Sequence, residues 1–215
     1  LSTQTNLVGS QTLVLSGTGI IASRDVGSNK TVSVGTLTLA DGSNGGLAAN
    51  YTLSGGTHQL TVTQRPLNSS GSKSYDANTD ALANAITLSN LAGGETLVHS
   101  GTASTSSANA GSYTINNLSG IGISNGTGTA SNYTLTGGTH SFTINRRVVS
   151  LSGGSRQYNG SATAIAADLP TINNLVGSET LTLSGNGVVE NANVGDNKPL
   201  TNLSGLTLQN GSNGG

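Results

Sequence analysis

The stretch Asn50–Val62 reads NYTLSGGTHQLTV, and Asn132–Ile144, which starts 82 residues later, reads NYTLTGGTHSFTI. Apolar and polar residues alternate on both sides of the Gly-Gly pair, a pattern that predicts two short β-strands joined by a tight turn. A catalytic site needs to occur only once in a chain, whereas a building unit recurs. The recurrence therefore indicates an array of similar modules.

A second set of segments gives the period of the repeat. Leu7, Leu91 and Leu175 lie at equivalent points of three related segments and are spaced by 84 and 84 residues; the segments are NLVGSQTLVLSGTG (Asn6–Gly19), NLAGGETLVHSGTA (Asn90–Ala103) and NLVGSETLTLSGNG (Asn174–Gly187). This register predicts a partial C-terminal part of a module at 1–65, a complete module at 66–147 and a partial N-terminal part at 148–215. We expect the chain to be a piece of a longer repetitive protein that continues with a sequence like Leu47–Val62.

The composition favours an extracellular protein. Charged residues make up 8% of the chain, the net charge is −1, and Cys, Met and Trp are absent. Regular alternation of Val, Ile, Leu and Thr with small polar residues separates the chain from disordered sequences. The low charge predicts no binding of nucleic acid, and no apolar run reaches the roughly 20 residues of a membrane span, so no membrane insertion is expected.

The pattern predicts an all-β fold, in which each repeat is a small β-sandwich-like module and the modules form an elongated, semi-rigid array. We expect strands at Thr12–Ser16, Thr31–Leu39, Tyr51–Ser54 and His58–Thr63, separated by turns rich in Gly and Asn. The Ala-rich segments 80–88 and 162–169 could each form one helical turn. A β-grasp-like α+β module is therefore the alternative.

The aliphatic and aromatic residues that recur should form the cores. Leu13, Leu97 and Leu181 are predicted to be buried equivalents, as are Leu53 and Leu135. The recurring tyrosines are expected to pack in the cores with their hydroxyl groups hydrogen-bonded near module edges; they are Tyr51, Tyr133, Tyr75 and Tyr158. A sugar-binding platform would instead need an exposed pair of aromatic side chains.

The chain offers several residues of the types found in catalytic and metal sites, but their pattern favours structural roles. His58 and His140 follow equivalent Gly-Gly turns, and His99 takes the place of Leu15 and Leu183. Glu95 and Glu179 correspond to Gln11, and an amide cannot replace a general acid or base. We therefore predict no catalytic residues, no metal ligands and no cofactor, and the chain is not expected to be an enzyme.

Two further groups of residues have a possible chemical role. The loop Asp41–Gly46 resembles an oxygen-rich calcium loop but has few carboxylates, so a glycine-rich turn is the preferred interpretation. Lys30 and Lys198 share a position at which a Lys–Asn crosslink is conceivable. Lys73 is replaced by Arg156 in the next copy, and Thr114 lies near the second-copy position of Lys30, so a structural role is favoured for these residues too.

The chain resembles the YDG-type repeat modules of large bacterial surface proteins, including filamentous-haemagglutinin-like adhesins exported by two-partner secretion. The resemblance rests on SYDAN and QYNGS, on LSNLAGGETLVHSGTA and on NYTLTGGTHSFTINRR, and it extends over essentially the whole chain. The Tyr-Asp-Gly signature is replaced by Tyr75-Asp76-Ala77 and by Tyr158-Asn159-Gly160. What the resemblance implies is a secreted, repetitive stalk or adhesive region.

We therefore expect a structural repeat region that is extracellular, either secreted or on the bacterial cell surface, and that forms a stalk or fibre for adhesion or a biofilm matrix. The expected partners are neighbouring repeats, further copies of the chain in fibres, and host or matrix glycans. The alternative is a binding module that itself recognises a carbohydrate, a host glycoprotein or another copy of the protein.

Overall fold

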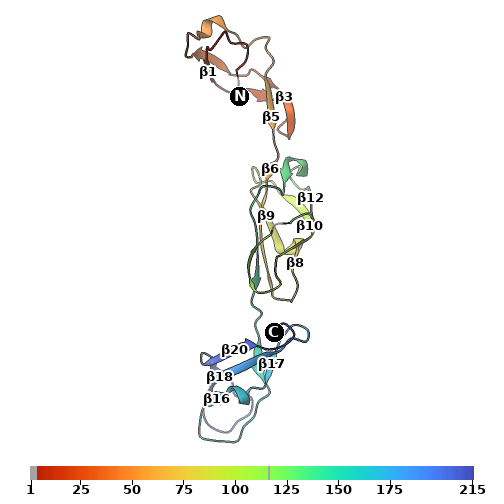
Figure 1. Ribbon diagram of the computed structural model, residues 1–215, viewed down its shortest axis with the longest axis vertical. Coiled ribbons are helices and arrows are strands. Elements are labelled where there is room, and N and C mark those ends of the chain that lie inside the picture. The colour runs from red at the N-terminus through yellow and green to blue at the C-terminus, as the bar shows by residue number, and fades with distance from the viewer. Residues whose placement is uncertain (1–3, 116) are drawn as a thin grey trace. The chain divides into compact units, whose positions relative to one another are not determined.

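The computed structural model describes residues 4–115 and 117–215, and in these residues the chain forms strands, turns and four three-residue 3-10 turns (Figure 1). The 3-10 turns are η1 (Ala48–Asn50), η2 (Ala83–Ala85), η3 (Ala130–Asn132) and η4 (Ala166–Asp168). The first ten strands are β1 (Leu13–Ser16), β2 (Ile20–Ile21), β3 (Gly27–Ser33), β4 (Thr38–Asp41), β5 (Gln59–Val62), β6 (Arg65–Pro66), β7 (Asn68–Ser74), β8 (Asp80–Leu82), β9 (Ile86–Ser89) and β10 (Leu97–Ser104). The other strands are β11 (Gly111–Thr114), β12 (Ile121–Asn125), β13 (Tyr133–Thr134), β14 (His140–Asn145), β15 (Ser150–Ser152), β16 (Thr163–Ile165), β17 (Thr171–Asn173), β18 (Leu181–Val189), β19 (Leu200–Asn202) and β20 (Leu206–Asn210).

The predicted all-β fold is confirmed. Both Ala-rich segments form a single helical turn, η2 and η4, and no helix in the described residues is long and apolar enough to cross a membrane. Two strand predictions are wrong. Thr31–Leu39 is interrupted by a turn in which the Leu37 N–H donates to the Val34 carbonyl (2.9 Å). Tyr51–Ser54 forms no strand, whereas its second-copy counterpart, β13, pairs with β6.

Backbone contacts divide the chain into two compact units. Unit 1 comprises Leu1–Ser69, Leu88–Ser100 and Ile121–Thr139, and unit 2 comprises Ser70–Thr87, Gly101–Gly120 and His140–Gly215. Within unit 1, β1 pairs with β4, β3 lies between β2 and β5, and all these pairs are antiparallel. β6 and β13 form a short parallel pair in the same unit.

Unit 2 contains the pairings that matter most for the cores. β11 pairs antiparallel with β14, which lies between β11 and β7 in the order β11-β14-β7-β9. β7 and β14 run parallel, since Ser69 donates to the carbonyl of Thr139 and Tyr75 to that of Asn145. Further along the chain, β15 pairs with β17, and β18 pairs with β16, β19 and β20, always antiparallel.

The best-formed core belongs to residues 66–147. Its four most deeply buried large side chains are Leu67, Ile115, Phe142 and Ile144. The predicted leucine positions face inward but are less enclosed than expected: Leu13 is buried, and the remaining positions, Leu53, Leu97, Leu135 and Leu181, are only half-buried. The strands are too short to cover these leucines fully, so the aromatic and β-branched residues of β14 fill the centre.

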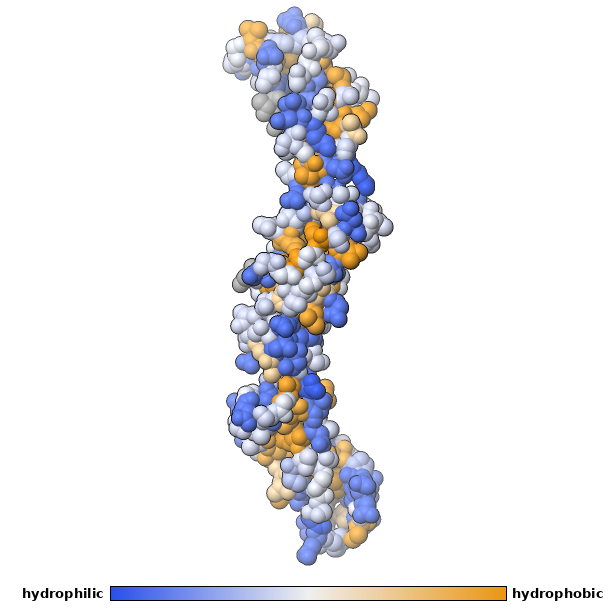
Figure 2. Space-filling view, turned by 90° about the vertical axis from the view of Figure 1, so that its right-hand side faces the viewer, coloured by the Kyte–Doolittle hydropathy of each residue, from blue (hydrophilic) through white to orange (hydrophobic). Residues whose placement is uncertain are grey.

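The surface mixes apolar and hydrophilic residues (Figure 2). Exposed large apolar side chains occur along the whole described chain, among them Val14, Ile20, Leu60 and Leu208. Isolated exposed aliphatic residues are ordinary on protein surfaces and by themselves indicate no binding site.

Candidate functional site

The Tyr-Asp-Ala segment at the end of β7 forms a loop that is closed by a lysine. The Lys73 ammonium group contacts Asp76 Oδ1 (2.8 Å) and donates to the carbonyl (2.9 Å) and Oδ1 (2.6 Å) of Asn78. Asp76 Oδ1 in turn accepts the N–H of Asn78 (3.2 Å). Ala77, between them, has a φ of 62°, in the left-handed region that L-residues disfavour. The segment is therefore a tight turn whose third position suits glycine.

The corresponding loop of the next copy has the same shape with different side chains. Arg156 replaces Lys73 and donates to the carbonyls of Ser161 and Thr163, and it forms an ion pair with Asp168 (3.0 Å). Asn159 Oδ1 accepts the N–H of Ser161 (3.1 Å), as Asp76 does in the earlier copy. Gly160 holds the third position with a φ of 73°. The exchange shows that the loop needs a long cation to hold its carbonyl groups, and a lysine and an arginine both serve.

Replacing Ala77 with glycine should stabilise the chain. Alanine in the left-handed region carries a steric cost of about 1 kcal/mol that glycine avoids. We expect Ala77→Gly to raise the free energy of unfolding by up to about 1 kcal/mol, which chemical denaturation would measure. The converse change, Gly160→Ala, should destabilise by a similar amount, and equal stability of all three proteins would contradict this interpretation of the turn.

Asp76 makes this loop sensitive to acid. Burial alone would raise the pKa of the carboxyl group, but the hydrogen bonds from Lys73 and from the Asn78 amide, with the charge of Lys73, lower it overall. A lowered pKa in the folded state means that the stabilisation is present above the pKa of the unfolded chain and disappears as the pH falls through the folded value.

We therefore expect stability to fall between about pH 5 and about pH 3, around the ordinary aspartate pKa, and to fall less in Asp76→Asn. Asn159 of the next copy shows that asparagine fits the same turn. Thermal melting at several pH values would measure the difference, and parallel pH profiles of the two proteins would rule out the carboxylate as the cause.

An arginine and an asparagine brace the start of each described repeat after residue 64. Arg65 donates to the Asn90 carbonyl (2.6 Å) and Oδ1 (2.8 Å), and the Asn90 amide donates to the Pro66 carbonyl (2.7 Å). In the next copy Arg147 makes the same two bonds to Asn174, whose amide donates to the Val148 carbonyl (2.7 Å). Both asparagines have positive φ, of 66° and 70°. This pair was not singled out from the sequence, although the recurrence of Arg and Asn at matching positions could have indicated it.

The Glu95 position is a hydrogen-bond acceptor for a tyrosine. The Tyr133 hydroxyl donates to Glu95 Oε2 (2.6 Å) and accepts the N–H of Ala92 (3.1 Å). The hydrogen bond to Glu95, followed by burial, raises the pKa of Tyr133. The equivalent Tyr51 donates to Gln11 Oε1 (2.5 Å). An amide thus replaces the carboxylate without loss of the contact. Glu95 also pairs with Arg24 (2.9 Å), and Glu179 accepts a hydrogen bond from Tyr75.

Tyr133→Phe should therefore cost more than Glu95→Gln. Tyr133 is only 3% exposed, and loss of its hydroxyl leaves the Ala92 N–H without that acceptor, at a cost of about 1–2 kcal/mol. Glu95→Gln keeps an acceptor, as Gln11 does, and should cost less than about 1 kcal/mol. Chemical denaturation of both variants would compare them, and a larger loss in Glu95→Gln would indicate that the charge of Glu95 has a role of its own.

One backbone carbonyl receives a side-chain donor in all three copies. The three donor–acceptor pairs, spaced by 84 residues at the acceptor, are Lys30 to the carbonyl of Asp25 (2.5 Å), the Tyr113 hydroxyl to that of Asn109 (2.7 Å) and Lys198 to that of Asn193 (2.7 Å). A phenol cannot form an amide crosslink, so the shared property of these residues is the ability to close the loop. Lys198 also donates to the side chain of Asn191.

The loop Asp41–Gly46 is a turn in which the aspartate caps the backbone. Asp41 Oδ1 accepts the N–H of Ala48 (2.7 Å), and the Gly42 N–H donates to the Gly46 carbonyl (2.9 Å). Asn125 Oδ1 accepts the N–H of Ala130 (2.8 Å) at the equivalent place, so a neutral amide does the same work. His58 Nε2 lies 2.9 Å from the Leu53 carbonyl, across its Gly-Gly turn. In the described residues no three His, Cys, Asp or Glu side chains gather as a metal site would require.

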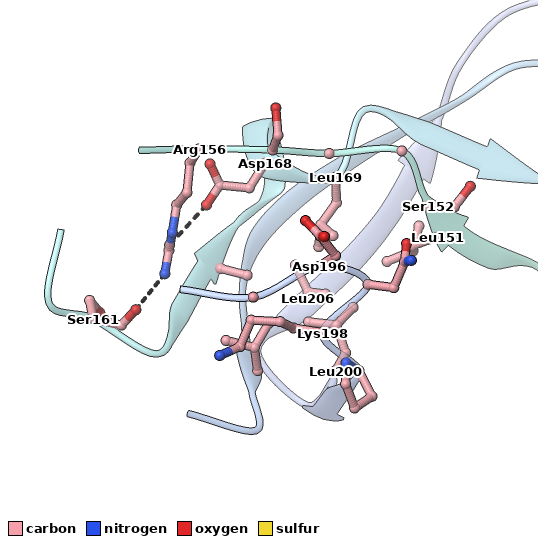
Figure 3. Close-up of a pocket in the computed structure, with 18 of the residues that line it drawn as sticks. Leu151, Ser152, Arg156, Ser161, Asp168, Leu169, Asp196, Lys198, Leu200 and Leu206 are labelled. Atoms are coloured by element: carbon pink, nitrogen blue, oxygen red, sulfur yellow. Dashed lines mark hydrogen bonds and ion pairs between the residues drawn. The ribbon is translucent and has the colours of Figure 1, made fainter. Parts of the chain in front are cut away.

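The largest opening lies in the last part of the chain, within unit 2. It has a volume of about 1240 Å³ and is lined by segments 149–161 and 191–200, with leucines of β18 and β20. Figure 3 shows Leu169, Leu200 and Leu206 gathered in it, and Arg156 directed toward Asp168 and Ser161. Tyr158 also lines it and is 68% exposed, so its predicted core position is wrong. The other aromatic side chains are buried or half-buried.

The repeat pattern agrees with one known family. The YDG domain model matches the chain three times, over residues 1–59, 56–141 and 145–215. Neither the curated proteins nor the solved structures include a match to this chain. Because the three matches together span nearly all of the sequence, the chain belongs to the YDG domain family.

Proposed function

We propose that this chain is a structural repeat region of a secreted bacterial surface protein, and that its modules form an extracellular stalk or fibre that serves adhesion or a biofilm matrix. The observation that carries the proposal is the exchange of side chains at fixed contacts. A lysine, a tyrosine and a lysine hold the same carbonyl in successive copies, and Gln11 and Glu95 accept the same tyrosine hydroxyl.

Exchange of this kind suits a scaffold and does not suit a chemical site. Acid–base catalysis depends on a group with a defined pKa, and such a group cannot become an amide or a phenol between copies. A module that only has to fold requires a donor or an acceptor at each turn, whatever its chemical class. The proposal therefore assigns no catalytic role to these residues.

The binding-module alternative would need a surface that recognises a ligand. Sugar-binding surfaces commonly stack ligands on exposed aromatic rings, and Tyr158 is the one aromatic side chain of the described residues that is largely exposed. A single ring does not form the exposed pair on which the alternative depends. This supports a role that depends on the fold and length of the repeats.

Direct binding measurements test the proposal. The full chain, immobilised and exposed to glycan panels and to host cell surfaces, should show no saturable binding, because its polar groups are engaged in turns. Tyr158→Ser is the matched variant, since it removes the one exposed ring. Saturable binding by the natural chain that is lost in Tyr158→Ser would overturn the stalk proposal in favour of a binding module.

A further inference from the structure

The opening in the last part of the chain corresponds to the place of one strand. In residues 66–147, β14 lies between β11 and β7, and its Phe142 and Ile144 are each 1% exposed. In residues 148–215 the counterparts of the two flanking strands are Ser150–Arg156 and Gly195–Lys198. β15 ends at Ser152, and both Gly153–Arg156 and Gly195–Lys198 form no strand. The opening lies between these two segments, where a β14-like strand would lie.

The interior of this opening is apolar and incompletely covered. Leucines at 151, 169, 183, 200 and 206 line it. Among the described residues after 147, only Ala164 belongs to the buried apolar core, whereas ten such residues lie in 66–147. The difference arises because no side chains equivalent to Phe142 and Ile144 fill the space. The groove is therefore shaped for an extended segment with two apolar side chains, two residues apart.

The first part of the chain carries such a segment. β5 (Gln59–Val62) has the sequence counterpart of β14, with Leu60 at the position of Phe142 and Val62 at that of Ile144. Leu60 is 39% exposed, whereas Phe142 is 1% exposed. β5 is thus a closing strand whose main apolar side chain still lies partly in solvent.

One edge of β5 is also available for pairing. Val32 donates to the carbonyl of His58, and Leu60 lies opposite Lys30, so the even-numbered residues of β5 bond to β3. Gln59 and Thr61 then direct their main-chain groups to the other edge. In β14 the odd-numbered Asn145, together with Thr139 just before the strand, accepts the hydrogen bonds of β7. β5 therefore presents the set of groups that β14 uses to bind β7.

We propose that the groove formed by Ser150–Ser161 and Asn191–Leu200 accepts β5 of a second copy of this chain. β5 would run parallel to Ser150–Arg156, with Leu60 and Val62 inserted among the leucines of the groove. Strand addition of this type combines main-chain hydrogen bonds with side-chain pockets. Since the donor and the acceptor are different surfaces of one chain, the contact is head to tail and can continue into filaments. This proposal concerns association between chains and holds whether or not the repeats serve as a stalk.

The test is sedimentation of the full chain over a wide range of concentration. We expect the mean mass to rise with concentration. Thr61→Pro removes the main-chain donor on the free edge of β5 while leaving Leu60 in place, and Leu60→Asp removes the apolar contact. Each should weaken association at least about tenfold, which corresponds to about 1.4 kcal/mol. Val14→Asp, which changes an exposed residue of β1, is the matched control and should associate like the natural chain.

A peptide identical to residues 137–147 supplies a second readout. Added in excess, it should occupy the groove, raise the melting temperature of the chain and return the associated chains to monomers, whereas a peptide with Ser in place of Phe142 and Ile144 should do neither. A natural chain that stays monomeric at every concentration would overturn the proposal, even if the peptide binds. Association that Thr61→Pro and Leu60→Asp both leave unchanged would overturn it as well.

Discussion

Replacing Phe142 with alanine is expected to lower the free energy of unfolding of residues 66–147 by about 3–5 kcal/mol. The Phe142 ring is 1% exposed in the central strand of the order β11-β14-β7-β9, so its removal leaves a cavity between strands that come from distant parts of the sequence. A loss of this size is a large fraction of the stability of a small domain. Chemical denaturation followed by circular dichroism would measure it.

Leu60→Ala is the matched control for Phe142→Ala. Leu60 holds the equivalent position in β5 but is 39% exposed, so its truncation should cost less than about 1.5 kcal/mol. The comparison belongs at low protein concentration, where association of chains does not bury Leu60. Equal losses in the two variants would mean that Phe142 is not the centre of a core.

Gly71→Ala is expected to be the next most damaging change, at about 3 kcal/mol, the upper part of the range for overpacking. A Cβ atom at Gly71 would lie 2.1 Å from the Ala85 carbonyl oxygen and 2.9 Å from the Phe142 ring. The backbone of Ala85 cannot yield as a flexible side chain would, so β7 would have to move away from its neighbours. Thermal and chemical denaturation would both report the loss.

Gly122→Ala separates this close approach from the general effect of replacing a strand glycine. The nearest atom to a Cβ at Gly122 is Ser100 Oγ at 3.9 Å, an ordinary contact. Because alanine restricts the unfolded chain more than glycine does, Gly122→Ala should be neutral or slightly stabilising. Similar losses at Gly71 and Gly122 would contradict the explanation by close approach.

The sequence was sufficient to predict the period and the strand-rich fold, because both depend on local patterns. Alternating residues around Gly-Gly turns marked β5 and β14, and Ala-rich segments marked η2 and η4. The same local information could not show that Thr31–Leu39 bends at Val34, where hydrogen bonding to Leu37 closes a turn.

Contacts between distant residues were harder to predict. The Arg65–Asn90 contact joins residues 25 apart, and its geometry depends on how β6 lies beside β13. The exposure of Tyr158 depends equally on tertiary structure, since its counterpart Tyr75 is half-buried. Identical sequence positions thus differ in burial according to which strands surround them, and the sequence of one position does not contain that information.

The proposal that these repeats act through their length is tested most directly by small-angle X-ray scattering of the natural chain and of chains with one and two added copies of residues 66–147. A domain of this size is roughly 30 Å across, so the maximum dimension should increase by about 30–40 Å for each added copy if the repeats form a stalk. The measurement belongs at low concentration and with Thr61→Pro in every chain, so that association does not contribute. A maximum dimension that stays nearly constant as copies are added would contradict the proposal.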